Sequence, residues 1–246
     1  MKPALGTSLL RLFTLQGSWN YERMMGVGMG VATEPLLRDL PGGPGGEAYR
    51  AALARHSRFF NSHPYLAGLA VGAGARAEYD GVPPEQIERL RTALCGPLGA
   101  VGDRVVWAGW LPFTSALAIA GVARGAGWAA VALFLLVYNI GHVALRWWAL
   151  RSGWKLGMSV AQALRHPLLQ RAAAVMGPAM AVAMGAALPL AAVYLGARFS
   201  GAWIAAFGGV TALAFILLRA FPSRLTGLRV GLIAVVIALL GGAAWR

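Results

Sequence analysis

The chain has 246 residues, of which 58% are hydrophobic and only 13% are charged. A soluble domain usually carries about 25% charged residues, so this composition argues against a water-soluble fold and indicates an integral membrane protein. The net charge of +13 does not indicate nucleic-acid binding, because the basic residues of the second half mostly occupy short gaps between apolar runs and form no continuous face.

The N-terminal segment predicts an amphipathic helix that lies on a surface. Apolar and polar residues recur there at helical spacing on opposite faces. The apolar positions are Leu5, Leu9, Leu12 and Phe13, and the polar positions are Thr7, Ser8 and Arg11. Because Arg11 interrupts the apolar stretch and no Ala-x-Ala site follows, we do not expect a cleaved signal peptide.

Two further apolar segments, residues 26–31 and 64–75, are shorter than the roughly 20 residues that cross a bilayer. We therefore expect them to form re-entrant or interfacial helices. Residues 41–46 (PGGPGG) between them predict a flexible loop. Residues 85–94 then predict a short amphipathic helix with its apolar side chains on one side.

The glycines at positions 26, 28 and 30 do not form a nucleotide-binding loop, because no strand pattern precedes them and their spacing departs from G-x-G-x-x-G. Tight helix packing is the expected role. Gly68 and Gly72 have the Gly-x-x-x-Gly spacing that lets two helix backbones approach closely.

The histidines, the cysteine and the possible nucleophiles show no catalytic or metal-binding arrangement. The four histidines lack ligand spacing, and His142 inside an apolar run is expected to be a hydrogen-bonded core residue. The single cysteine, Cys95, excludes an intrachain disulfide. No nucleophile has an evident base, so we expect no catalytic residue, cofactor or metal site.

From residue 105 onward, long apolar runs are bounded by isolated basic residues. Five runs have about the length of ~20 residues that a transmembrane helix needs. They are 105–123, 125–145, 172–197, 199–218 and 230–245. We expect Pro178 and Pro189 to kink or break the third run.

The expected fold is an all-α integral membrane protein in two parts. Residues 105–246 form about five transmembrane helices, and residues 1–104 form an N-terminal region of amphipathic and re-entrant or interfacial helices.

Basic residues alternate between the two sides of the predicted spans. Residues 1–104 hold eleven Lys and Arg, 146–171 hold five and 219–229 hold three, whereas the other gaps and the C-terminus hold one each. Cytoplasmic loops carry the excess of Lys and Arg, so we expect the N-terminus in the cytoplasm and the C-terminus outside. The five predicted spans contain no carboxylate, which argues against a self-contained proton-coupled carrier or pump.

Three blocks in the first 110 residues resemble one known family. Residues 16–24 (QGSWNYERM) resemble the N-terminal signature of the mannose/fructose/sorbose-type phosphotransferase permease subunit IID. Residues 55–64 (RHSRFFNSHP) resemble that family's Arg-His…Phe-Phe-Asn-Thr-His-Pro segment. Residues 96–103 (GPLGAVGD), followed by Trp107, resemble its Gly-Pro-Leu-Ala-Gly-Ile-Gly-Asp…Trp segment.

The resemblance implies a multi-pass subunit of the bacterial inner membrane that pairs with a IIC membrane protein to move a hexose. It also implies soluble IIA and IIB partners, which relay phosphate from phosphoenolpyruvate and phosphorylate the sugar on entry. The subunit itself is then a non-catalytic transporter component, which fits the missing carboxylates. The alternative is a IID-derived membrane protein with a regulatory or scaffolding role and no sugar transport.

Sugar hydroxyls are recognised by amides and carboxylates, often beside an aromatic ring. Asn61, His63 and Asp103 are the candidate sugar contacts, because each is polar and lies in a block that resembles the family. Structural roles remain open: Asn61 caps a helix that Pro64 begins, or Asp103 caps the first span or pairs with Arg104. We expect Trp19 and Asn20 to anchor the N-terminal helix at the membrane interface.

Overall fold

The structure, a computed structural model, describes residues 3–196 together with positions 209, 212, 213, 216 and 220. The chain divides into two compact units, Met1–Leu188 and Pro189–Arg246. The first unit contains everything described below except the last turns of one long helix. Apart from two isolated β-bridges, the regular structure of the described part is helical.

The helices follow one another through short connections. In chain order they are α1 (Leu5–Leu12), α2 (Gly26–Leu37), α3 (Glu47–His56), α4 (Ala67–Tyr79), α5 (Pro84–Gly102), α6 (Leu111–Ala123), α7 (Gly127–Leu156) and α8 (Pro167–Gly196). Three shorter elements are the 3₁₀ turn η1 (Gly43–Gly45), the π-helical η2 (Asp103–Trp110) and the 3₁₀ helix η3 (Gly157–Arg165).

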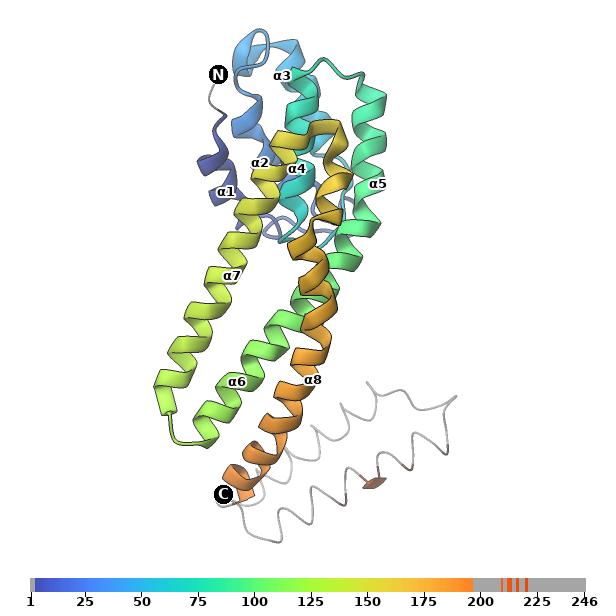
Figure 1. Cartoon of the computed structure of the whole chain (residues 1–246). Coiled ribbons are helices and arrows are strands. Elements are labelled where there is room, and N and C mark those ends of the chain that lie inside the picture. Colours follow the sequence, from blue (N-terminus) through green and yellow to red (C-terminus); the bar gives the residue numbers. More distant parts are fainter. Residues whose placement is uncertain (1–2, 197–208, 210–211, 214–215, 217–219, 221–246) are drawn as a thin grey trace, which may run out of the picture. The chain divides into compact units, whose positions relative to one another are not determined.

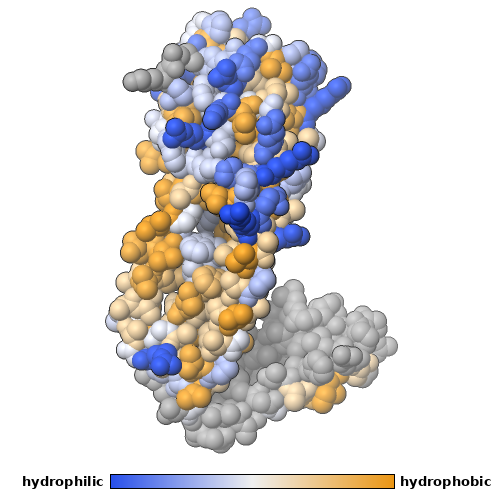
Figure 2. Space-filling model, viewed as in Figure 1, coloured by the Kyte–Doolittle hydropathy of each residue, from blue (hydrophilic) through white to orange (hydrophobic). Residues whose placement is uncertain are grey.

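Within the first unit, α1 to α4 gather at one end around the C-terminal part of α7, while α6 and the N-terminal part of α7 run away from them as an antiparallel pair (Figure 1). We call α1 to α5 with residues 146–165 the head, and α6 with residues 127–145 the hairpin. Hydrophilic side chains gather on the head, whereas apolar side chains cover the hairpin (Figure 2). An apolar outer surface of this kind is what a helix that crosses a membrane presents to lipid.

Helix α4 is the centre of the head. Residues 67–75 are all buried, and the helix packs against α2, α5, η3 and most extensively α7. Its apolar run is too short to cross a bilayer, and burial among protein helices accounts for its composition. Helix α2, the other short apolar segment, is also mostly buried in the head.

Glycines set the distance between α4 and α7. A Cβ atom on Gly68 would lie 2.9 Å from the backbone nitrogen of Leu150, and one on Gly153 would lie 2.9 Å from the carbonyl carbon of Leu69. The two backbones are therefore in contact along this face, as the spacing of Gly68 and Gly72 predicts. The expected packing role of Gly26, Gly28 and Gly30 is confirmed as well, since all three are buried.

Helix α7 belongs to both parts of the unit. The sequence predicts a span over residues 125–145 and a connecting segment over 146–171, but the helix continues through Leu156. The continuation occurs because Ala149, Leu150 and Gly153 extend the helical pattern and are buried among the other helices of the head. The connecting segment is thus helix and 3₁₀ helix instead of a loop.

The long helices show how proline is accommodated. Of the kink or break predicted at Pro178 and Pro189, the break does not occur, because α8 runs continuously through both residues. Membrane helices tolerate proline where neighbouring groups satisfy the freed carbonyls.

Two described stretches, Pro84–Ala123 and Gly127–Gly196, are long and apolar enough to cross a membrane by length and composition. The predicted runs 199–218 and 230–245 lie outside the described residues, apart from isolated helical positions in the first.

The predicted N-terminal helix is confirmed as α1, but the side assigned to Ser8 is wrong. Ser8 is buried, and its hydroxyl donates to the carbonyl of Ala32 at 2.7 Å. Helix α1 packs on α2 through this contact. The small serine fits the helix–helix interface, and its hydrogen bond offsets the cost of burying the hydroxyl. Phe13, assigned to the apolar side, is 45% exposed.

The other local predictions fit the fold. Residues 41–46 reverse the chain through η1, with positive φ at Gly42 (82°) and Gly43 (63°), which glycine adopts without steric cost. The helix predicted over residues 85–94 is the first half of α5, where Ile87 and Leu94 are buried.

A largely buried ion pair joins α3 to α4. The Arg55 guanidinium donates two hydrogen bonds to Glu78, at 3.0 and 3.1 Å, and His56 lies 3.1 Å from the same carboxylate. Burial raises the pKa of Glu78, but the hydrogen bonds from His56 and Arg55 outweigh it and leave that pKa lowered. The carboxylate is therefore ionised and holds α3 on α4.

The first testable prediction concerns the glycine contact. We expect Gly72→Ala to lower the free energy of unfolding by about 1–3 kcal/mol, because the added methyl group meets the backbone of α7 around Leu150 and Trp154 and cannot move aside. Gly6→Ala in α1 is the control, since no atom lies near its Cβ position. Thermal unfolding in detergent measures both variants, and equal stability of Gly72→Ala and wild type would contradict the packing.

Candidate functional site

A cavity of about 580 Å³ opens where the head meets η2. This volume lies within the range of about 300–1,000 Å³ that small-molecule sites occupy. Its polar lining residues are Gln16, Asn61, Ser62, His63 and Asp103, and its aromatic lining residues are Trp19, Phe59 and Trp107. Small residues of α5, among them Gly96, Gly99 and Ala100, complete the wall. The three predicted sugar contacts therefore line one cavity.

Backbone hydrogen bonds join the first two sequence blocks. The N–H of Met25 donates to the carbonyl of Phe60 at 2.9 Å, and the N–H of Phe60 donates to the carbonyl of Arg23 at 3.3 Å. Gly26 packs directly on the backbone of Arg58, leaving no room for a side chain. These contacts place residues 16–24 beside residues 55–64.

The third block reaches the cavity through the end of α5. A Cβ atom on Gly102 would overlap the ring of His63, and one on Gly99 would lie 3.9 Å from the Cα of Ser62. The glycines of residues 96–103 therefore let α5 lie against the loop that carries Ser62 and His63. Asp103 follows immediately as the first residue of η2.

His63 forms the inner wall of the cavity. The side chain is 1% exposed, and its Nδ1 atom accepts a hydrogen bond from the backbone N–H of Tyr65 at 3.2 Å. The neutral ring must then carry its proton on Nε2, a buried atom without a hydrogen-bond partner among the described residues. Its ring lies 5.0 Å from that of Trp107, in an edge-on arrangement.

The surroundings keep His63 neutral near pH 7. Burial is the main reason that the pKa of His63 is lowered to about 4, followed by the positive charge of Arg146 and, once it is protonated at low pH, that of His142. The ring therefore offers an N–H donor and no charge under ordinary conditions. A neutral donor suits recognition of an uncharged polar ligand.

Asn61 and Asp103 line the cavity with their side chains exposed. Neither of the structural alternatives is present among the described residues. The first residues of α4 receive no side-chain cap from Asn61, and Asp103 makes neither a capping hydrogen bond nor an ion pair with Arg104. Both side chains are thus free to contact a ligand in the cavity.

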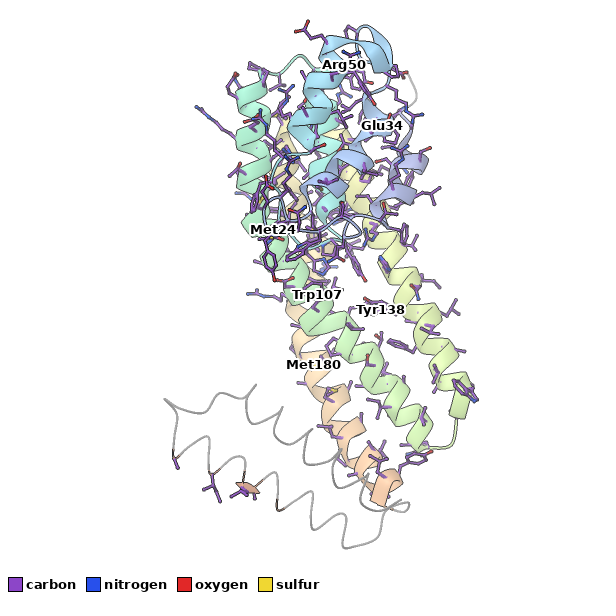
Figure 3. The ribbon with its side chains drawn as sticks, turned by 180° about the vertical axis from the view of Figure 1, so that it is seen from behind. Met24, Glu34, Arg50, Trp107, Tyr138 and Met180 are labelled. Atoms are coloured by element: carbon purple, nitrogen blue, oxygen red, sulfur yellow. The ribbon has the colours of Figure 1, made fainter. Side chains whose placement is uncertain are left out.

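Four residues of the cavity lining are not among the predicted sugar contacts: Gln16, Trp19, Ser62 and Trp107. Trp107 follows the third block and lies where the head meets the hairpin (Figure 3). Trp19, expected as a membrane anchor, lines the cavity and is 43% exposed. All but Trp107 lie inside the blocks that resemble the family, which is the signal that points to them.

Asn20 supports the site indirectly. Its side-chain oxygen accepts hydrogen bonds from the backbone N–H groups of Glu22 and Arg23, at 3.1 and 2.8 Å. These hydrogen bonds hold the turn of residues 20–24, which joins Trp19 to the segment that pairs with Phe60. The expected anchoring of Asn20 in the membrane interface stays a prediction.

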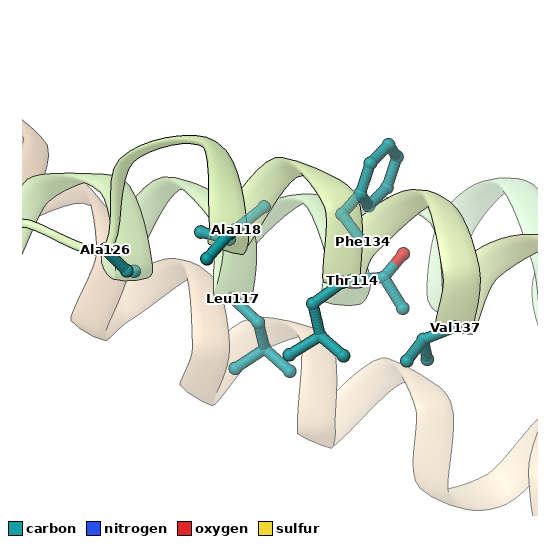
Figure 4. Close-up of a pocket in the computed structure, with 10 residues that line it drawn as sticks. Thr114, Leu117, Ala118, Ala126, Phe134 and Val137 are labelled. Carbon is teal, nitrogen blue, oxygen red and sulfur yellow. The ribbon is translucent and has the colours of Figure 1, made fainter.

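A second cavity, of about 290 Å³, lies between α6 and α7 in the hairpin (Figure 4). Its lining is apolar apart from Thr114, whose hydroxyl donates to the carbonyl of Trp110 at 2.8 Å. A sugar has no hydrogen-bond partner there, so this cavity is not a candidate sugar site.

Within the described residues, no group of His, Cys, Asp and Glu is arranged to hold a metal ion. His142 is hydrogen-bonded to Arg146, as expected, but it is only half-buried and does not belong to the core.

The fold and the cavity define a class of protein: a helical membrane protein whose head carries a cavity lined by polar and aromatic side chains. A profile of the PTS system mannose/fructose/sorbose family IID component matches residues 2–237. The chain belongs to this family, and the resemblance carried by the three sequence blocks is confirmed.

Curated relatives agree. The chain is 30% identical over 167 residues to the mannose-specific EIID component of Escherichia coli K12, a match that covers 66% of this chain and 58% of the relative. It is 33% identical over 172 residues to the sorbose-specific EIID component of Klebsiella pneumoniae, covering 68% and 62%. The chain thus spans about three fifths of the length of the relatives it matches.

Solved structures show the same fold. A chain described as a membrane protein aligns with a TM-score of 0.71 at 21% identity, covering 98% of this chain and 96% of that one. A chain of the mannose transporter ManYZ in complex with microcin E492 aligns with a TM-score of 0.58 at 23% identity, covering 98% and 95%. At these identities the likeness concerns the fold.

The second testable prediction follows from the lowered pKa of His63. The unfolded chain binds a proton at this histidine near pH 6.5 and the folded chain near pH 4, so stability falls as the pH drops through this window. Burial also lowers the pKa of His56, so the wild-type dependence contains both histidines. We expect His63→Gln to show a shallower fall in unfolding temperature than wild type. Identical slopes would show that His63 is not held neutral by the fold.

Proposed function

We propose that this chain is the IID membrane subunit of a phosphoenolpyruvate-dependent sugar phosphotransferase permease, and that its cavity contacts a hexose of the mannose, fructose or sorbose type. The observation that supports this most strongly is the convergence of three sequence blocks, residues 16–24, 55–64 and 96–103, on one cavity. The mannose- and sorbose-specific names of the relatives agree with a hexose.

The side chains of the cavity suit a neutral polyol. Asn61 supplies an amide donor and acceptor, Asp103 supplies a carboxylate acceptor, and the Nε2–H of His63 supplies a donor. Trp19 and Trp107 present aromatic faces against which the apolar face of a sugar ring packs. This combination of a few directional polar groups with aromatic walls is typical of small-molecule sites.

The proposed subunit acts with partners. We propose that it pairs with a IIC membrane protein, that IIA and IIB carry the phosphate, and that IIB phosphorylates the sugar as it enters. Phosphorylation traps the sugar, so translocation needs no proton relay, in agreement with the lack of carboxylates in residues 105–246. The subunit is then non-catalytic and requires neither cofactor nor metal.

We further propose a multi-pass placement in the bacterial inner membrane with the N-terminus in the cytoplasm. The site-bearing region of residues 1–104 precedes a transmembrane region of residues 105–246 with five spans. The excess of Lys and Arg in the head supports its cytoplasmic placement. The turn at the tip of the hairpin carries only one charged residue, Arg124, which supports an outer position.

The third testable prediction concerns the sugar contacts. In a reconstituted IIC–IID pair, we expect Asn61→Ala and Asp103→Asn each to weaken mannose, fructose or sorbose binding by about tenfold, the loss of one good polar contact. Asn139→Ala is the matched control, because Asn139 lies on α7 away from the cavity and its amide donates to the carbonyl of Leu135 in its own helix. Complex yield is measured separately from affinity, and unchanged affinity in both site variants would remove them from the site.

The fourth testable prediction concerns topology. Reporter fusions after residue 155 should report a cytoplasmic position, and fusions after residue 124 should report the outer side, because the hairpin crosses the membrane once in each direction. An outer position for residue 155 would contradict the orientation.

A further inference from the structure

Arg146 lies in α7 where the hairpin enters the head, and it is 4% exposed. Its Nε atom donates to Nε2 of His142 at 2.6 Å, and its Nη1 atom donates to the carbonyl of Leu12. The guanidinium plane also lies over two rings, 5.2 Å from the centre of Phe13 and 4.8 Å from that of Tyr65. Arg146 therefore contacts the end of α1, the loop after His63 and its own helix at once.

The charge of Arg146 is held without a carboxylate. Among the described residues no ion pair includes this side chain. A carbonyl oxygen, an imidazole nitrogen and two aromatic faces surround it instead, all of them weaker partners than a carboxylate. Each partner must keep its position, because the loss of any one leaves a buried positive charge poorly compensated. Such an arrangement fixes its neighbours in place.

Tyr65 connects Arg146 to the cavity. Its ring stacks on that of His142 at 4.0 Å with an interplanar angle of 13°, and its hydroxyl lies 2.6 Å from that of Tyr138. The backbone N–H of the same residue donates to Nδ1 of His63 and so decides which nitrogen of that ring carries the proton. Figure 3 shows Tyr138 on α7, beyond Trp107 on the hairpin side. A continuous set of contacts thus runs from Arg146 through Tyr65 to His63.

We infer that Arg146 is a positioning residue for the sugar-contact loop, residues 61–65, and that it ties this loop to the membrane hairpin. The inference rests on the proposed sugar site. Arg146 holds Tyr65 against α7, and the backbone N–H of Tyr65 holds the ring of His63 through its Nδ1 atom. Residues 127–145 of the hairpin and Arg146 belong to one helix, so the contacts of Arg146 join the loop directly to the helix that continues into the hairpin.

The test compares two substitutions on the same helix. In a reconstituted pair with IIC, we expect Arg146→Gln to weaken sugar binding by about tenfold or more, because small displacements of contact residues have large effects. Arg151→Gln is the matched control, since Arg151 is an exposed arginine of α7. Its affinity should equal that of wild type. Unchanged affinity in Arg146→Gln overturns the inference.

A second variant covers the case in which Arg146→Gln does not accumulate. Phe13→Leu removes one ring from beside the guanidinium and keeps every hydrogen bond of Arg146. We expect about a threefold weaker affinity, corresponding to the loss of one cation–π contact. An affinity equal to that of wild type overturns the inference here as well.

A spectroscopic readout separates this inference from the proposed function. In ¹⁵N-histidine-labelled protein, the Nδ1 atom of His63 should give the signal of an unprotonated ring nitrogen near pH 7, and Arg146→Gln should shift it. If that signal shifts while Asn61→Ala leaves affinity unchanged, the positioning role stands and the sugar site fails. If Asn61→Ala weakens binding but Arg146→Gln changes neither signal nor affinity, only the positioning role fails.

Discussion

The backbone contact between α4 and α7 is the constraint on which the rest of the first unit depends. Gly68, Gly72 and Gly153 leave no side chain between the two helices, so α4 lies directly on the part of α7 that has entered the head. Dispersion and close packing act over the whole length of this contact, and burial of the apolar residues of α4 among the helices of the head adds to them. The C-terminal part of α7 is thereby fixed in the head, and the N-terminal part of the same helix forms one half of the hairpin.

The candidate site follows from this arrangement. The loop before α4 carries Asn61 and His63, so the position of α4 also determines where this loop ends. The glycines of α5 then bring Asp103 to the same place, and backbone hydrogen bonds from residues 23–25 close the remaining side. Polar groups that are distant in sequence thus meet at the boundary between the head and the hairpin.

Much of this organisation was predictable from the sequence, for physical reasons that differ between segments. Long apolar runs bounded by arginine predict helices such as α6 and α7, because hydrocarbon admits little else. The glycine spacing at residues 68 and 72 predicts close packing but not the partner helix, since periodicity carries no information about what lies opposite. The continuation of α7 beyond Arg146 was missed because a basic residue is usually read as the end of a span, whereas this one is buried among carbonyl and aromatic groups.

The site residues show a similar division. Asn61, His63 and Asp103 were found through the blocks that resemble the family, and the fold then brings them into one cavity. Gln16, Trp19 and Trp107 were missed because a cavity depends on the three-dimensional meeting of α5, η2 and two loops. Ser8 was assigned to the wrong side of α1 for a comparable reason: a serine that donates to a carbonyl of a neighbouring helix is as well placed inside as outside.

The central claim is that this subunit itself contributes contacts to the sugar. The most direct measurement is photo-crosslinking of the reconstituted IIC–IID pair with a photoreactive mannose analogue, followed by peptide mapping of the labelled subunits. The account predicts label on peptides containing residues 59–64 and 96–107 of this chain, and its loss when excess mannose is added. Label confined to the IIC subunit, with none on these peptides, would contradict it.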